Sequence, residues 1–129
     1  MRFALNIGTR TSQHYGLPTD LSIGRAALAL RDYGFDFDLF SYHYYYHPVA
    51  GQSEDTMVLH VSDGGNEVTL EVRFCEVAAK LHQDCIAVVP LVPTTDNSYG
   101  PRWEGGELIG PYASEWGQFD RTFFVLPHL

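Results

Sequence analysis

The segment from Phe35 to His47 constrains the fold more than any other part of the chain, because it reads as one long β-strand. It holds four of the eight tyrosines and two of the six histidines among 129 residues. Residues on a strand point alternately to its two faces. Phe35, Phe37 and Leu39 are therefore predicted to face the core. The even positions then form an aromatic row on the other face, made of Phe40, Tyr42, Tyr44 and Tyr46.

Five further segments show the periodicity of strands or helices. Strands are predicted at 3–8, 56–61 and 85–89, and helices at 21–33 and over most of 67–82. Residues 67–74 also alternate as a strand would, but helical spacing continues to residue 82 and favours the helix. The order strand, helix, strand, strand, helix, strand predicts an α+β fold of the ferredoxin-like βαββαβ type. This fold has four antiparallel strands, with both helices on one face.

Polar residues and a glycine indicate where the first predicted helix begins and ends. Thr19 or Asp20 is expected to be the N-cap, because such side chains accept hydrogen bonds from the first backbone N–H groups. Gly34 is expected just past the C-terminus, where a left-handed backbone is common. The preceding loop, 9–16, carries hydroxyls, Arg10 and His14 beside a strand end. It reads as a surface loop, with ligand binding as the alternative.

The chain divides into a core, 1–92, and an extension, 93–129, within a single domain. Proline and glycine punctuate the extension, which is predicted to form a short strand at 107–110, a helical turn at 111–116 and a packed segment at 123–126. Its aromatic residues favour packing on the core rather than a loose tail. They are Tyr99, Trp103, Tyr112, Trp116, Phe119, Phe123 and Phe124.

In this fold the helices cover one side of the sheet only, so the other side needs a cover. That side is predicted to carry Ala4 and Asn6 beside Tyr42 and Tyr44, and an aromatic face of this size is rarely left bare. Three covers are considered: the extension, a second copy of the chain, or a ligand stacked on the tyrosines. The extension is the plainest of the three. A homodimer through the sheet face is the partner interaction that we expect.

Composition excludes several other classes of partner. The formal charge is −8, and the eight Lys and Arg residues form no basic run, so nucleic acid is not an expected partner. The acidic surface reads as a solubility feature, with mimicry of nucleic acid toward a basic protein as the alternative. No apolar run approaches the roughly 20 residues of a membrane span, and no signal peptide is apparent at the N-terminus. We therefore expect a cytoplasmic protein without a membrane partner.

Histidines of the long strand do not form a metal motif. His43 and His47 would lie roughly 13 Å apart along a strand, too far to share one ion. A metal site would instead need His14, His60, His82 or a carboxylate to be brought together by folding. No HExxH, GxSxG, P-loop or GxGxxG motif is present in the sequence. Neither a metal nor a cofactor is predicted.

Four other reactive side chains have plain interpretations. Cys75 and Cys85 lie among apolar residues and are expected to be buried reduced thiols, with a disulfide or a catalytic thiol as alternatives. Asp36 and Asp38 would lie about 6.6 Å apart on one strand face. Paired carboxylates can divide acid and base roles, but solvated acids near a strand start are the expectation here.

Two short patterns resemble those of a known group of proteins. The run at 83–88 reads QDCIAV, and GPYA at 110–113 is followed by WGQF at 116–119. Small uncharacterised phage and prophage proteins have a similar QDCIAV-type strand followed by a GPxAxxWGxF-type ending. The resemblance covers roughly residues 56–124 and excludes the Tyr/His strand and the insert at 93–106. It implies a phage or prophage accessory protein in the host cytoplasm and brings no catalytic residues.

Two functions follow from these patterns. The first is a non-enzymatic binding protein that sequesters a partner protein or a small ligand. Its predicted surface comprises Tyr42, Tyr44, Tyr46, His47, Arg10, Trp103 and Trp116. The alternative is a small enzyme of unknown reaction. Its acid–base site would comprise His43, His47, Asp38 and Arg10.

Overall fold

The computed structural model describes the backbone of residues 1–47, 52–65 and 69–124, and the side chains of these residues except those from 39 to 54. Within this part of the chain, six strands form one antiparallel sheet in the order β2-β3-β1-β4-β5, and β6 also pairs with β4. The strands are β1 (Arg2–Gly8), β2 (Phe35–His47), β3 (Gln52–Asp63), β4 (Ile86–Pro93), β5 (Tyr99–Pro101) and β6 (Glu107–Ile109).

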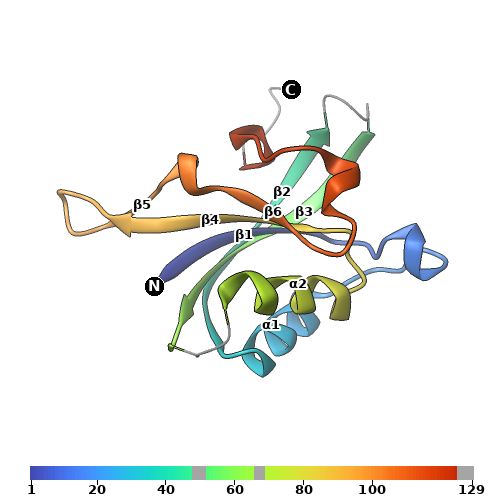
Figure 1. Ribbon diagram of the computed structural model, residues 1–129, viewed down its shortest axis with the longest axis horizontal. Helices are drawn as coiled ribbons and strands as arrows, with labels where there is room; N and C mark the ends of the chain where they lie inside the picture. Colours follow the sequence, from blue (N-terminus) through green and yellow to red (C-terminus); the bar gives the residue numbers. More distant parts are fainter. Residues whose placement is uncertain (48–51, 66–68, 125–129) are drawn as a thin grey trace.

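Helices α1 (Ile23–Asp32) and α2 (Leu70–Lys80) lie against one side of this sheet (Figure 1). Short 3₁₀-helices occur in the connections: η1 (Gln13–Tyr15), η2 (Trp103–Gly105), η3 (Ala113–Trp116) and η4 (Arg121–Phe124). The predicted α+β class is confirmed. Neither α-helix among the described residues has the length and apolar character needed to cross a membrane.

The main core lies between the two helices and the sheet. Phe3, Leu5 and Ile7 of β1 are buried in it, as their alternation predicts. The ambiguous segment forms α2 from Leu70 onward, which confirms the helical interpretation. One side of α2 is buried against the sheet, including Phe74. The apolar residues of α2, at helical spacing, and those of β1, at alternate positions, are therefore buried in the same core.

Helix α1 begins later than predicted. Ser22 is its N-cap, and the Ser22 hydroxyl accepts a hydrogen bond from the backbone N–H of Arg25 at 3.2 Å. The expectation that Thr19 or Asp20 caps this helix is wrong. Both residues instead interact with the preceding loop, so they precede the helix rather than start it. Gly34 follows the C-cap with φ of 87°, as expected.

A β-bulge at Asp38 reverses the alternation of β2. Phe37 pairs with Val61, but Leu39 pairs with the adjacent residue His60, so Asp38 is an extra residue on β2. Residues directly opposite one another in an antiparallel pair share a face of the sheet. Every position of β2 after Asp38 therefore belongs to the face opposite to the one that simple alternation predicts.

The prediction that the aromatic row lies on the sheet face opposite the helices is therefore wrong. The backbone pairing puts these positions on the helix side. Tyr42 pairs with Met57, which is fully buried in the core on the helix side. Asn6 pairs with Val58, on the opposite face. Leu39 belongs to that opposite face instead of the core face. The positions on the helix side are 40, 42, 44 and 46, whose side chains are outside the described residues.

Strands β2 and β3 form a hairpin that is much longer than the helices. β2 has 13 residues and α1 has 10, which correspond to lengths of about 43 Å and about 15 Å. Helix α1 contacts β2, and only two residues connect them, so the helix runs back along the first part of the strand. The far end of the hairpin therefore extends past the helical layer, and Figure 1 shows it directed away from α1 and α2.

The extension covers part of the sheet face opposite the helices. Its strands β5 and β6 pair with β4 and widen the sheet. Phe123 of η4 packs against Ala87 of β4, both more than nine-tenths buried, and Asn6 donates a hydrogen bond to the Phe123 carbonyl. η4 also contacts β2. Of the three covers considered, the extension is the one that the described residues contain.

Candidate functional site

Three segments that are distant in the sequence meet at the end of β1 and the start of β4. These strands are antiparallel neighbours, so the chain leaving β1 lies beside the chain entering β4. The first segment contributes Ser12 and His14, the second contributes Asp84, and η3 contributes Glu115 and Trp116. These five residues are called the His14 cluster below.

Asp84 is the centre of the His14 cluster. Its Oδ1 accepts a hydrogen bond from Ser12 Oγ at 2.5 Å and lies 2.7 Å from Nδ1 of His14. Its Oδ2 accepts a hydrogen bond from the indole Nε1 of Trp116 at 3.0 Å. Both oxygens of this largely buried carboxylate are therefore engaged, and they join all three segments.

The His14 ring lies between two carboxylates. Nδ1 faces Asp84, and Nε2 lies 3.2 Å from Oε2 of Glu115. The ring stacks on Tyr112, with centroids 4.0 Å apart and an angle of 5° between the planes. The Asp84 side chain is 15% exposed, whereas that of Glu115 is 53% exposed. The cluster is therefore closed at Asp84 and opens to solvent beside Glu115.

Electrostatics follow from this arrangement. The hydrogen bond with Asp84 raises the pKa of His14 above its ordinary value, and the charge of Glu115 acts in the same direction. Burial acts to raise the pKa of Asp84, but the hydrogen bonds from Ser12, His14 and Trp116 together hold that pKa below its ordinary value. The cluster thus favours a positive charge at the ring and a negative charge at Asp84.

Backbone contacts hold the three segments in place. The N–H of Tyr112 donates to the carbonyl oxygen of Asp84 at 2.9 Å, and the N–H of Ser12 donates to that of His82 at 2.7 Å. Gly110 passes so close to the Asp84 carbonyl that a Cβ atom would clash with it. A glycine is therefore required where the extension turns across the start of β4.

The cluster is not arranged for nucleophilic attack. In a Ser–His–Asp triad the histidine stands between the hydroxyl and the carboxylate. Here Ser12 and His14 both bond to the same oxygen of Asp84, and Nε2 of the ring faces Glu115. The cluster instead contains an imidazole and carboxylate oxygens, and one side of it faces solvent. Donor atoms of these types suit a cation.

The structure separates the residues of the predicted binding surface. Trp116 belongs to the His14 cluster. Arg10 lies in the same loop as His14, but its guanidinium is 3.7 Å from Asp20. Trp103 lies on the extension under the guanidinium of Arg121, 4.9 Å from the ring centroid. The remaining predicted residues lie on β2, with side chains outside the described residues: Tyr42, Tyr44, Tyr46 and His47.

Asp38 and Arg10, the two residues of the alternative acid–base site whose side chains are described, are not brought together. Asp38 is paired with Arg2 at the start of β1, with Oδ2 and a guanidinium nitrogen 3.0 Å apart. Arg10 lies beyond the other end of β1, so roughly 20 Å of strand separates it from Asp38. The side chains of His43 and His47 are outside the described residues.

Sequence patterns placed His14 in a loop and named it among the histidines that folding would have to gather for a metal site, but they gave no role to Asp84 or Glu115. The predicted strand order contains a signal for Asp84, because pairing β1 with β4 sets the turn at 82–85 beside the loop at 9–16. Glu115 reaches the cluster through the path of the extension, which no periodic pattern describes. A three-segment cluster of this kind therefore needs the tertiary fold.

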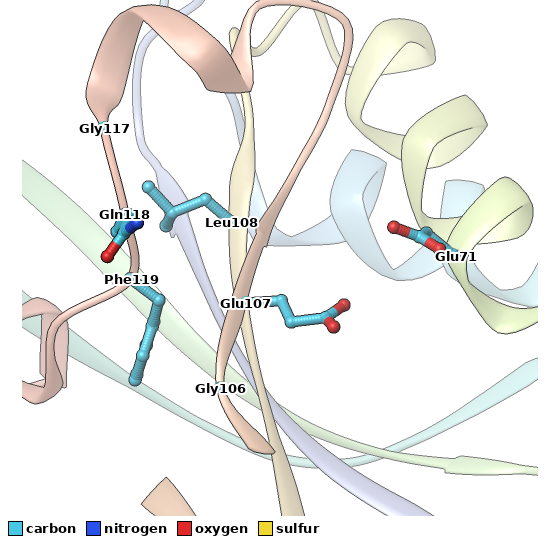
Figure 2. A pocket seen from close by; sticks show the side chains of 7 residues that line it. All are labelled: Glu71, Gly106, Glu107, Leu108, Gly117, Gln118 and Phe119. Carbon is cyan, nitrogen blue, oxygen red and sulfur yellow. The ribbon is translucent and has the colours of Figure 1, made fainter. Parts of the chain in front are cut away.

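A second feature is a hollow of about 380 Å³ between α2, β6 and the extension. Figure 2 shows the side chains of Glu71 and Glu107 directed toward one another across one side of it, with Phe119 and Gln118 on the other. The hollow is shallow and open, and its charged groups are both carboxylates. The described residues that line it include no imidazole, hydroxyl or cationic side chain that would suggest a reaction.

Comparison with protein-family models, with curated proteins and with solved structures found no match for this chain.

Proposed function

We propose that this chain is a non-enzymatic binding protein, a phage- or prophage-derived accessory factor that sequesters a partner protein or a small ligand in the host cytoplasm. The observation that carries the proposal is the long β2–β3 hairpin, which extends past the helices and has Tyr42, Tyr44 and Tyr46 at positions of one face. Tyrosine side chains are large, rigid and able to donate one hydrogen bond, which suits them to binding surfaces. The resemblance to phage proteins supports the origin.

The partner contact that we favour is a homodimer through the sheet, on the hairpin face that carries these tyrosine positions. The extension already occupies the opposite face around Asn6 and Ala87. Helix α1 reaches only the first part of β2, so the helical layer stops short of the outer tyrosine positions. A second copy presents the same surface, and self-complementary contacts between identical chains are the commonest form of oligomer.

The alternative of an acid–base enzyme has less support. A general base needs a nitrogen or oxygen that faces the substrate. Both ring nitrogens of His14 face carboxylates, and the Ser12 hydroxyl, 3.3 Å from Nδ1, donates its shorter hydrogen bond of 2.5 Å to Asp84. Of the predicted acid–base set, Asp38 and Arg10 also lie toward opposite ends of β1.

We further propose that β1 to β4, α1 and α2 form a ferredoxin-like unit. The antiparallel order β4-β1-β3-β2, together with two helices on one side, supports this assignment. In this interpretation β5 and β6 are additions from the extension, which pair along β4.

Sedimentation equilibrium tests the homodimer. The double variant Tyr44→Ala/Tyr46→Ala should weaken self-association about tenfold or more, because truncating one central aromatic residue of an interface typically costs more than 1 kcal/mol. The matched control is Tyr99→Ala, which removes a half-exposed tyrosine from β5, away from the hairpin. Circular dichroism checks that each variant is folded. A monomeric wild type, or a dimer that the double variant leaves unchanged, would contradict the proposal.

A further inference from the structure

We propose that the His14 cluster binds one divalent transition-metal ion of the Zn²⁺ class. One donor atom from each of His14, Asp84 and Glu115 lies within 4.8 Å of the other two; His14 and Glu115 are the proposed ligands, and Asp84 orients the His14 ring. Imidazole nitrogen and carboxylate oxygen are ligands that Zn²⁺ takes in proteins. The imidazole favours Zn²⁺, Co²⁺ or Ni²⁺ over Mg²⁺ and Ca²⁺, which prefer all-oxygen sites.

The distance between the two outer donors fits a single ion. Nε2 of His14 and Oε2 of Glu115 are 3.2 Å apart. Two ligands on a tetrahedral Zn²⁺ with bonds of about 2.1 Å are separated by about 3.4 Å. His14 and Glu115 therefore need little movement to bind the same ion. Glu115 is half-exposed, so water can complete the coordination from the solvent side.

Asp84 is suited to the role of a positioning residue for His14. It lies at Nδ1, on the side of the ring away from Glu115, and its two oxygens are held by Ser12 and Trp116. Metal-binding histidines commonly donate their other ring N–H to a carboxylate, which orients the ring and makes the bound nitrogen a better ligand. The observed contacts match this pattern and leave Nε2 for the ion.

The charges in the cluster also suit a dication, because two carboxylates, those of Asp84 and Glu115, flank the same imidazole ring. The ion would also join the loop after β1 to η3, so that its binding strengthens the attachment of the extension.

Isothermal titration with Zn²⁺, using a chain without a histidine tag, tests the site. The wild type should bind one ion, and a large excess of Mg²⁺ should not displace it. His14→Gln should abolish this binding, and Glu115→Gln should weaken it about tenfold or more. The matched control is Glu104→Gln, an exposed glutamate of η2 that should bind Zn²⁺ as the wild type does. The visible spectrum of the Co²⁺ form should show a histidine-dependent band.

Hydrogen exchange gives a second readout, which shows where along the chain the ion binds. Zn²⁺ should slow exchange in residues 12–16 and 110–117 of the wild type, and Glu115→Gln should remove most of this effect. His14 and Glu115 are not buried, so both variants should fold, which circular dichroism checks. Failure of the wild type to bind Zn²⁺ would overturn the proposal. Equal binding by wild type and His14→Gln would overturn it as well. Neither result bears on the homodimer.

Discussion

At the scale of single residues, Arg73 and Asp63 form the most buried ion pair among the described side chains. Arg73 is 3% exposed, and its two terminal nitrogens donate to the two carboxylate oxygens of Asp63, each at 3.1 Å. The guanidinium also donates to the carbonyl of Tyr33 and lies over the ring of Phe35 at 4.6 Å. The pair therefore holds α2 to the end of β3 and to the start of β2.

Asp63→Asn should destabilise the protein by roughly 3–5 kcal/mol, because it removes the carboxylate that both terminal nitrogens of the buried Arg73 bond to. Urea unfolding measures this difference. The control is Asp32→Asn, which removes the partner of Lys80 in a pair whose side chains are each about half-exposed. Exposed pairs contribute less than about 1 kcal/mol, so the control should change stability little. Equal costs for the two variants would show that the burial of Arg73 has no energetic consequence.

The same pair gives a pH dependence with a definite sign. The hydrogen bonds from Arg73 hold the pKa of Asp63 below its ordinary value of 3.8, against burial, which acts to raise it. A carboxyl that is more acidic when folded stabilises the protein above its unfolded pKa and loses this contribution as the pH falls through its folded pKa. The stability difference between wild type and Asp63→Asn should therefore be full at pH 7 and shrink below about pH 4. A difference independent of pH would contradict this assignment.

At the scale of elements, the periodicity of apolar residues predicted segments in which residues are buried at regular intervals. The long strand was predicted at 35–47, where β2 lies, because every second residue at its start enters the core. Periodicity could not predict the bulge, because Asp38 is polar and its position depends on the pairing of β2 with β3 and on its contact with Arg2. One inserted residue then reversed the face of every later position. Local patterns thus located the strand but not its orientation.

The N-cap of α1 provides a test at this scale. Ser22→Ala should cost about 1 kcal/mol, because it removes the hydroxyl that accepts from the N–H of Arg25. Asp20→Ala is the matched control and should cost less than about 0.5 kcal/mol, since it removes an exposed side chain that forms a surface pair with Arg10. Chemical denaturation gives both values. If Asp20→Ala lost more stability than Ser22→Ala, Asp20 would be the N-cap, as the sequence suggested.

At the scale of the whole molecule, the extension is part of the sheet and of the packing on its second face. Packing of the extension was predictable from its aromatic content, and its path was not, because Pro and Gly positions allow many routes. The His14 cluster depends on that path, since Glu115 and Trp116 reach Asp84 only after the chain has passed β6. The core and the extension should consequently unfold as one unit.

The two tryptophans allow this to be measured, because both Trp103 and Trp116 lie in the extension while α1 and α2 lie in the core. Tryptophan fluorescence and far-UV circular dichroism should therefore give the same urea midpoint. Phe123→Ala should lower the free energy of unfolding by about 3 kcal/mol, because Phe123 is 8% exposed and packs on Ala87. Both urea midpoints should fall together. The control Leu17→Ala, at a residue that is 90% exposed, should change neither midpoint. If fluorescence changed at a lower urea concentration than circular dichroism, the extension would be a separately unfolding layer, and its attachment through the His14 cluster would be weaker than the contacts indicate.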